Sequence, residues 1–81
     1  MLFEELARRP GKVTRVWSVL SVQDTNEPLG EIRWHAPWRR YCFFPEGLTL
    51  YDHECLREIA DFVGEKTLGR KAERKLERSG L

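Results

Sequence analysis

Three stretches in the first half of the chain carry the hydrophobic pattern of β-strands. Residues 13–23 (VTRVWSVLSVQ), 29–35 (LGEIRWH) and 38–44 (WRRYCFF) are rich in β-branched and aromatic residues, which pack well on a pleated sheet. Polar residues 24–28 separate the first two stretches, and Pro45 follows the third. Because the connections are short, an antiparallel meander is the simplest pairing of these strands.

A helical period replaces this pattern after Asp52, a favourable residue for the N-cap of a helix. Apolar residues then recur at spacings of three and four, as on the buried face of an amphipathic helix: Cys55, Leu56, Ile59, Ala60, Phe62 and Val63. Gly64 is of the residue type that commonly follows the last helical turn. The sequence therefore predicts a helix that ends near residue 63.

Both ends of the chain are predicted to be helical as well. Residues 1–12 offer a small apolar face, and Pro10-Gly11 would end a short helical segment there. Residues 65–81 predict a second, basic helix or tail, because a cation recurs every four residues at Lys66, Arg70, Arg74 and Arg78.

Together these patterns predict an α+β fold. The expected architecture is a three-stranded antiparallel β-meander packed by one amphipathic helix, with a short N-terminal helical segment and a C-terminal basic helix. Its parts are residues 1–12, a core domain of residues 13–64, and residues 65–81. An apolar fraction of 41% is enough for a packed core and too high for a disordered chain. At 81 residues the core is small, so a partner or a second copy could contribute to stability.

The third predicted strand is aromatic on both faces, because side chains alternate along a strand. One face would carry Trp38, Arg40, Cys42 and Phe44, and the other Arg39, Tyr41 and Phe43. A single helix covers only one face, so the other needs a second covering element, a partner or a ligand. The contact surface predicted from this pattern consists of Arg33, Trp34, Trp38, Arg39, Arg40 and Tyr41, assisted by Arg70, Arg74 and Arg78 in the tail.

Three interpretations of this surface stay open. In the first, a terminal segment covers the rings and the arginine stems merely pack over them. In the second, the rings stack on unpaired bases while the arginines neutralise phosphates. In the third, the surface docks on another protein or on a second copy, since tryptophan, tyrosine and arginine are enriched at interface hot spots.

Residues for catalysis or metal binding are sparse. His35, Cys42, His53 and Cys55 are the thiol and imidazole groups, and only His53 and Cys55 are close in sequence. No glycine-rich phosphate loop and no complete nucleophile, base and orienting group are evident. We therefore expect a binding protein without cofactor, metal or enzymatic activity. Two cysteines in so small a chain also favour reduced thiols over a disulfide.

The net charge of +1 is unevenly distributed, since residues 64–81 carry +3 and residues 1–63 carry −2. A basic tail often serves solubility alone, but a continuous cationic stripe also suits a phosphate backbone or an acidic protein surface. No stretch of about 18 apolar residues occurs, and the acidic N-terminal segment does not match a signal peptide. These features predict a cytoplasmic protein with no membrane partner.

Four motifs carry a resemblance to known proteins: Val16-Trp17-Ser18-Val19, residues 29–34 (LGEIRW), residues 38–45 (WRRYCFFP) and residues 55–62 (CLREIADF). Over residues 13–63 the chain resembles a family of small uncharacterised proteins encoded by bacteriophages and prophages. The resemblance implies a compact sheet-and-helix fold and a phage-type origin, and it supplies no activity. Small phage proteins often bind host proteins or nucleic acids, so the resemblance adds a host or phage protein to the candidate partners.

Overall fold

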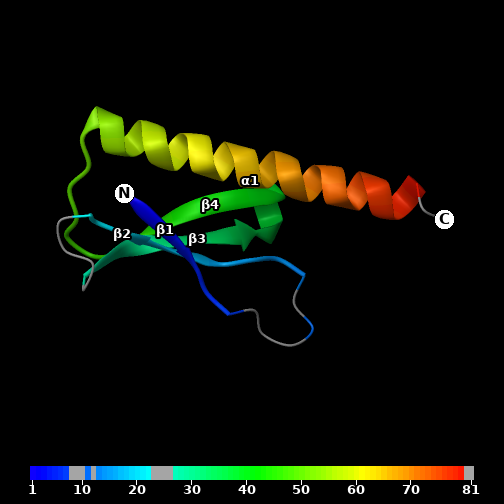
Figure 1. Ribbon diagram of the computed structural model, residues 1–81, viewed down its shortest axis with the longest axis horizontal. Helices are drawn as coiled ribbons and strands as arrows, with labels where there is room; N and C mark the ends of the chain where they lie inside the picture. The colour runs from blue at the N-terminus through cyan, green and yellow to red at the C-terminus, as the bar shows by residue number, and fades with distance from the viewer. Residues whose placement is uncertain (8–10, 12, 23–26, 80–81) are drawn as a thin grey trace.

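The computed structural model describes residues 1–7, 11, 13–22 and 27–79, with the side chains of the helix described as far as Glu73. In chain order the elements are β1 (Leu2–Glu5), β2 (Trp17–Leu20), β3 (Pro28–His35), the 3-10 turn η1 (Ala36–Trp38), β4 (Arg40–Pro45) and α1 (His53–Ser79). The strands form one antiparallel sheet in the order β1-β2-β3-β4. Helix α1 lies along one face of this sheet, and its C-terminal turns extend beyond it (Figure 1). The α+β class and the antiparallel meander are confirmed, whereas the number of strands and helices differs from the prediction.

The first difference is the N-terminal segment, which was predicted to be helical and contains strand β1. Leu2 pairs with Leu20 and Glu5 with Trp17, so β1 forms the outer strand beside β2. The Phe3 ring stacks on Phe62 of α1, with 4.1 Å between the ring centroids. A helix of so few residues is costly to nucleate, whereas pairing with β2 satisfies the backbone and buries Phe3 at once.

The second difference is at Gly64, where one helix was predicted to end and another to begin. Helix α1 instead runs without a break through Gly64 and Gly69. Packing on the sheet holds it on the far side of Gly64, since Thr67 Oγ1 accepts a hydrogen bond from the backbone N–H of Tyr41 at 3.0 Å. Tertiary contacts of this kind outweigh the low helix propensity of glycine.

The start of α1 was predicted correctly. The Asp52 carboxylate accepts a hydrogen bond from the backbone N–H of Cys55 at 2.8 Å, which is N-cap geometry. This bond is the main reason why the pKa of Asp52 is lowered. The pKa of the Cys55 thiol is raised, chiefly by its hydrogen bond to the same carboxylate. The reactive thiolate form of Cys55 is therefore disfavoured.

The core lies between α1 and the sheet. Trp17, Val19, Ile32 and Tyr41 form its centre, and Phe62 and Val63 pack against them from the helix. The rings meet edge to face, with centroids 5.3 Å apart for Trp17 and Tyr41 and 5.2 Å apart for Trp17 and Phe62. No helix among the described residues is long and apolar enough to cross a membrane.

Gly30 is fixed by the close packing of β3 on β4. A Cβ atom at this position would meet the backbone carbonyl oxygen of Phe44 and would lie 2.8 Å from the Phe43 ring. Only glycine therefore fits this place in the sheet without displacing β4.

The third predicted strand begins two residues later than expected. Pro37 lies at the start of the short turn η1, and Arg39 follows it in the left-handed conformation with a φ of 52°. Trp38 and Arg39 consequently lie in the connection between β3 and β4 and do not belong to either strand face. Within β4, Tyr41 and Phe43 join the core, so Arg40, Cys42 and Phe44 point to the opposite face.

Candidate functional site

The sheet face opposite α1 is not covered by any helix or strand among the described residues (Figure 1). Strand alternation, with the core residues as reference, assigns its side chains. We call this surface the open face, and it consists of Leu2, Glu4, Ser18, Leu20, Glu31, Arg33, His35, Arg40, Cys42 and Phe44. The predicted need for something to cover a second face is therefore met by no element of the described chain.

Arg33 of β3 and Phe44 of the edge strand β4 are in contact on the open face. The guanidinium carbon of Arg33 lies 3.9 Å from the centroid of the Phe44 ring, within the range of a cation–π contact. Glu31 approaches Arg33 at 3.8 Å, at the limit of an ion pair, and both side chains are substantially solvated. An exposed pair of this length contributes little, so the guanidinium plane remains available to a ligand.

A second group of rings lies at the end of the sheet where β3 leads into β4. The His35 ring is 4.9 Å from that of Trp38 and 6.1 Å from that of Phe44, in edge-to-face arrangements. Trp38 is 63% exposed, which is high for the largest aromatic side chain. The Arg40 Nε–H donates to the Trp38 carbonyl at 3.3 Å, so the turn that presents Trp38 is tied to β4.

The structure brings together four of the predicted contact residues, Arg33, Trp38, Arg39 and Arg40, on the open face and its adjoining turn. It separates Trp34 and Tyr41 from them, because both rings lie on the core side of the sheet. Tyr41 is 3% exposed, and its ring contacts Trp34 at 5.2 Å between centroids. Under α1, the Tyr41 ring fills the core and cannot contact a partner on the open face, and Trp34 packs against it.

Of the predicted contact residues in the tail, Arg70 is not part of the open face. Arg70 lies on α1 with a side chain only 13% exposed, and it pairs with Glu73 at 3.5 Å. Its position on the helix-covered side of the sheet separates it from Arg33 and Arg40. Arg74 and Arg78 lie within α1, and their side chains are outside the described residues.

Two residues join this site that the sequence did not single out as contacts. His35 and Phe44 complete the ring cluster with Trp38 and Arg33. Strand alternation already puts His35 on the face of Arg33, and Phe44 on that of Arg40. Their mutual contact depends on the cross-strand register, in which Glu31 pairs with Phe44 and His35 with Arg40. That register is set by the length of the η1 turn, which the sequence pattern does not give.

The thiols and imidazoles show no common site. Cys42 and Cys55 are free and lie on different elements, Cys42 on the open face and Cys55 on α1. Within the described ranges of the chain, no group of three or more histidine, cysteine, aspartate or glutamate side chains could hold a metal ion.

A scan against protein-family models gives no match for this chain, and searches of the curated proteins and of the solved structures give no significant match. The resemblance to small phage proteins consequently stays a prediction from the motif residues.

Proposed function

We propose that this protein is a non-enzymatic binding module whose open face takes single-stranded nucleic acid at the end formed by β3, η1 and β4. The observation that carries this proposal is the exposed Trp38 ring, which Arg39 and Arg40 follow in the chain and which the His35 ring connects to the Arg33–Phe44 stack. Rings and guanidinium planes stack on unpaired bases, and the same arginines attract phosphates.

The energetics favour a single strand over a duplex. Stacking of one base on an aromatic ring contributes about 1–3 kcal/mol, and it requires a base that is not already stacked in a helix. The open face has no protruding helix or ribbon among its described elements that would enter a major groove. Few basic residues belong to it, so we expect modest affinity with little preference for sequence.

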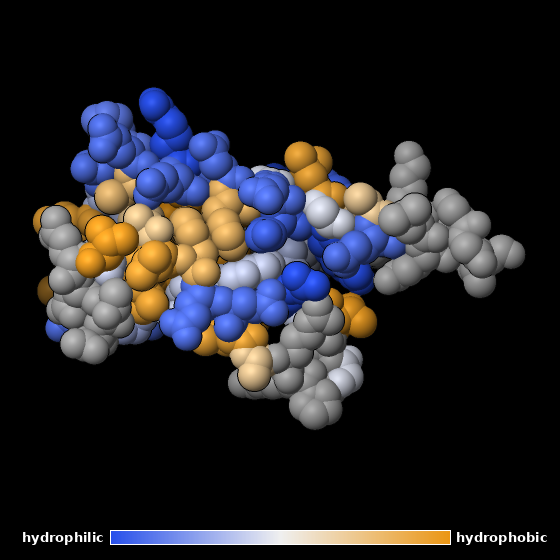
Figure 2. All heavy atoms as spheres, viewed as in Figure 1, coloured by the Kyte–Doolittle hydropathy of each residue, from blue (hydrophilic) through white to orange (hydrophobic). Residues whose placement is uncertain are grey.

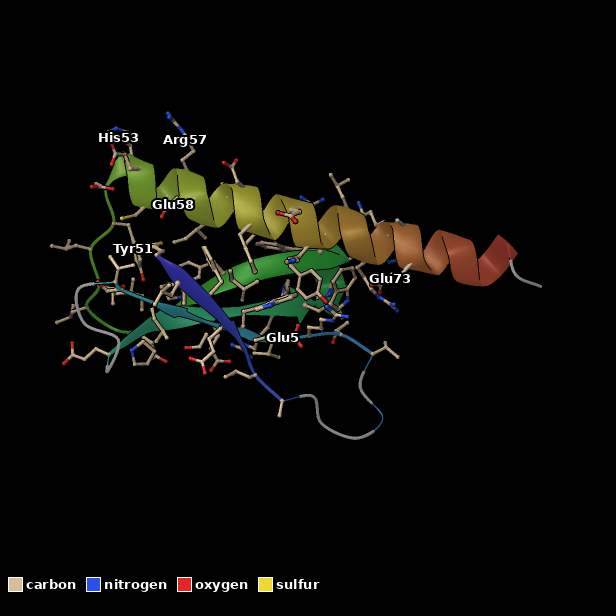
Figure 3. All side chains as sticks on the ribbon, viewed as in Figure 1. Glu5, Tyr51, His53, Arg57, Glu58 and Glu73 are labelled. Carbon is tan, nitrogen blue, oxygen red and sulfur yellow. The ribbon has the colours of Figure 1, made fainter. Side chains whose placement is uncertain are left out.

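The test compares two arginine variants with the same change of charge. Arg40→Ala removes a cation from the open face, and Arg57→Ala removes one from α1, where Figure 3 shows the side chain pointing away from the sheet. Binding of a fluorescent single-stranded oligonucleotide is measured at about 50 and 200 mM salt. We expect Arg40→Ala to weaken binding severalfold and to reduce the salt slope by about 1, with Arg57→Ala unchanged. Equal effects of both variants would contradict the assignment to the open face.

A second candidate function, docking on another protein, is favoured by the loop between β4 and α1. Leu48 and Leu50 are fully exposed there. The loop is nevertheless held in place, because the Thr49 hydroxyl donates to the Glu46 carbonyl at 3.0 Å and the Tyr51 hydroxyl to the Leu29 carbonyl at 2.7 Å. Hydrophobic surface gathers at this end of the molecule (Figure 2). Exposed leucines on an ordered loop are typical of a contact with a protein partner or a second copy.

Sedimentation velocity at increasing concentration tests the version with a second copy, and affinity capture tests the version with another protein. Leu48→Ser with Leu50→Ser should abolish either association and leave the open face intact. A strictly monomeric protein that captures nothing, with or without these substitutions, would contradict this second candidate.

A further inference from the structure

A groove lies on the opposite side of the sheet from the open face, beneath the C-terminal half of α1. Its volume is about 240 Å³, and its walls include Arg15, Trp17, Tyr41, Lys66, Gly69 and Arg70. Sites for drug-sized ligands are usually about 300–1,000 Å³, so this groove suits a smaller molecule. None of the open-face residues lines it, and its role is therefore separate from the function proposed above.

Gly69 keeps the groove open. No atom lies within 4 Å of the position that its Cβ would occupy. Glycine weakens a helix, and here neither a turn nor close packing requires it. The gain from glycine at this position is the open space beside the Tyr41 and Trp17 rings.

The groove is lined by the cations Arg15, Lys66 and Arg70, the carboxylates Glu65 and Glu73, and the Tyr41 hydroxyl. The Tyr41 hydroxyl accepts a hydrogen bond from the backbone N–H of Arg15 at 3.1 Å, and none of the described residues accepts its proton. A phenol with a nearly buried ring can thus donate to a ligand. The Lys66 ammonium lies 5.5 Å from the Trp17 centroid, at the same wall.

The two carboxylates of the groove pair with cations of the same groove. Glu73 approaches Arg70 at 3.5 Å and Glu65 approaches Lys66 at 3.9 Å. Figure 3 shows Glu73 on the side of α1 that faces the sheet. An anion in the groove would meet the guanidinium in competition with Glu73, and it would also accept the Tyr41 proton, which Glu73 does not.

We propose that this groove binds a small organic or inorganic oxyanion, a phosphate or a carboxylate, whose oxygens accept hydrogen bonds from Tyr41, Lys66 and Arg70. Charge-assisted bonds to arginine and lysine are the strong ones in such sites. The mostly buried position of Arg70 excludes much of the water that would otherwise screen them.

The first experiment follows backbone amide and tryptophan indole resonances during titration with inorganic phosphate or, separately, succinate, at constant ionic strength. We expect saturable shifts at Gly69 and the Trp17 indole. If phosphate saturates the site and succinate does not, the ligand is a phosphate; the reverse identifies a carboxylate. Shifts that do not saturate, or that spread over exposed lysines and arginines, would overturn the proposal.

Two glycine variants separate occupancy of the groove from stability of the helix. Gly69→Leu fills the groove, whereas Gly64→Leu adds the same side chain to the same helix at a position that does not line it and has no atom within 4 Å. We expect at least a tenfold loss of anion affinity in the first variant and none in the second. Equal affinities in the two variants would overturn the proposal.

Two charge variants should change the anion affinity in opposite directions. Glu73→Gln removes the competing carboxylate and should tighten anion binding severalfold, and Arg70→Gln should weaken it severalfold. A purely structural role for this ion pair would make both substitutions act in the same direction, which would overturn the proposal.

Discussion

Gly30 shows how a single residue can decide whether two strands pack closely, here β3 and β4. The Phe43 ring and the Phe44 carbonyl occupy the space that a methyl group would need. At the residue scale, the fold depends on the absence of a side chain at such a position as much as on favourable contacts.

Gly30→Ala should therefore destabilise the protein by about 1–3 kcal/mol, as overpacking of a tight site usually does. The measurement is chemical denaturation followed by circular dichroism. Gly47→Ala serves as the control, because nothing lies within 4 Å of that Cβ position and the change should be close to neutral. Equal stability of the two variants would show that β3 and β4 are less closely packed than described.

The lowered pKa of Asp52 predicts that the stability of the fold depends on pH. Its pKa is lowered in the folded protein by the hydrogen bond from Cys55, so its ionised form stabilises the fold above the unfolded-state pKa. That contribution is lost as the pH falls through the lowered folded-state pKa.

Asp52→Ala should lower the melting temperature by a few degrees at neutral pH. The difference from the original protein should shrink toward zero in strongly acidic solution, measured by thermal denaturation across that range. A difference that persists unchanged at low pH would show that the carboxylate charge does not contribute to the cap.

At the scale of elements, the continuous helix α1 differs most from expectation. Gly64 and Gly69 have open space around them and make no contact that requires glycine for packing. Gly64→Ala and Gly69→Ala should each stabilise the protein by about 0.5–1 kcal/mol, because alanine favours the helical state. Thermal denaturation measures both, and a loss of stability at Gly64 would indicate that the helix ends there after all.

Thr67 connects α1 to the strand edge. Thr67→Val removes the acceptor of the Tyr41 backbone N–H and should cost about 1–3 kcal/mol, since a partly buried donor loses its partner. Thr67→Ser retains the hydroxyl and should keep most of the stability. If valine and serine behave alike in denaturation, the hydrogen bond does not hold the helix in place.

Local pattern predicted the elements that depend on local causes. The Asp52 cap and the apolar stripe of the helix both follow from residue type and spacing. Strand β1 and the passage of α1 through Gly64 depend on contacts between distant segments, such as Phe3 with Phe62, which a pattern along the chain does not contain.

Only part of the candidate site could likewise be predicted from the local pattern. Arg33 and Arg40 were predicted as contacts and lie on the open face. Tyr41 was also predicted as a contact, but it lies on the opposite face of β4 from Arg40, and α1 covers that face. Which face α1 would cover could not be predicted, because aromatic residues occur on both faces of β4.

At the scale of the whole molecule, the described residues form one helix on a four-stranded sheet, and no other described element covers the second face of that sheet. The molecule is elongated, with extents of 46, 28 and 21 Å, because α1 continues past the sheet (Figure 1). The three candidate binding surfaces lie on different parts of this molecule. The open face lies on one side of the sheet and the groove lies on the other. The loop that carries Leu48 and Leu50 lies at the end of the molecule where α1 begins.

Binding of single-stranded nucleic acid to the open face is tested by comparing two indole resonances during titration with a short single-stranded oligonucleotide. Trp38 belongs to the proposed interface, and Trp17 is buried beneath α1. We expect saturable shifts of the Trp38 indole and of the Arg40 amide, with binding weaker at about 200 mM than at about 50 mM salt and with Trp17 nearly unmoved. No saturable change at Trp38 in either salt, or a larger change at Trp17, would show that the open face does not bind the strand.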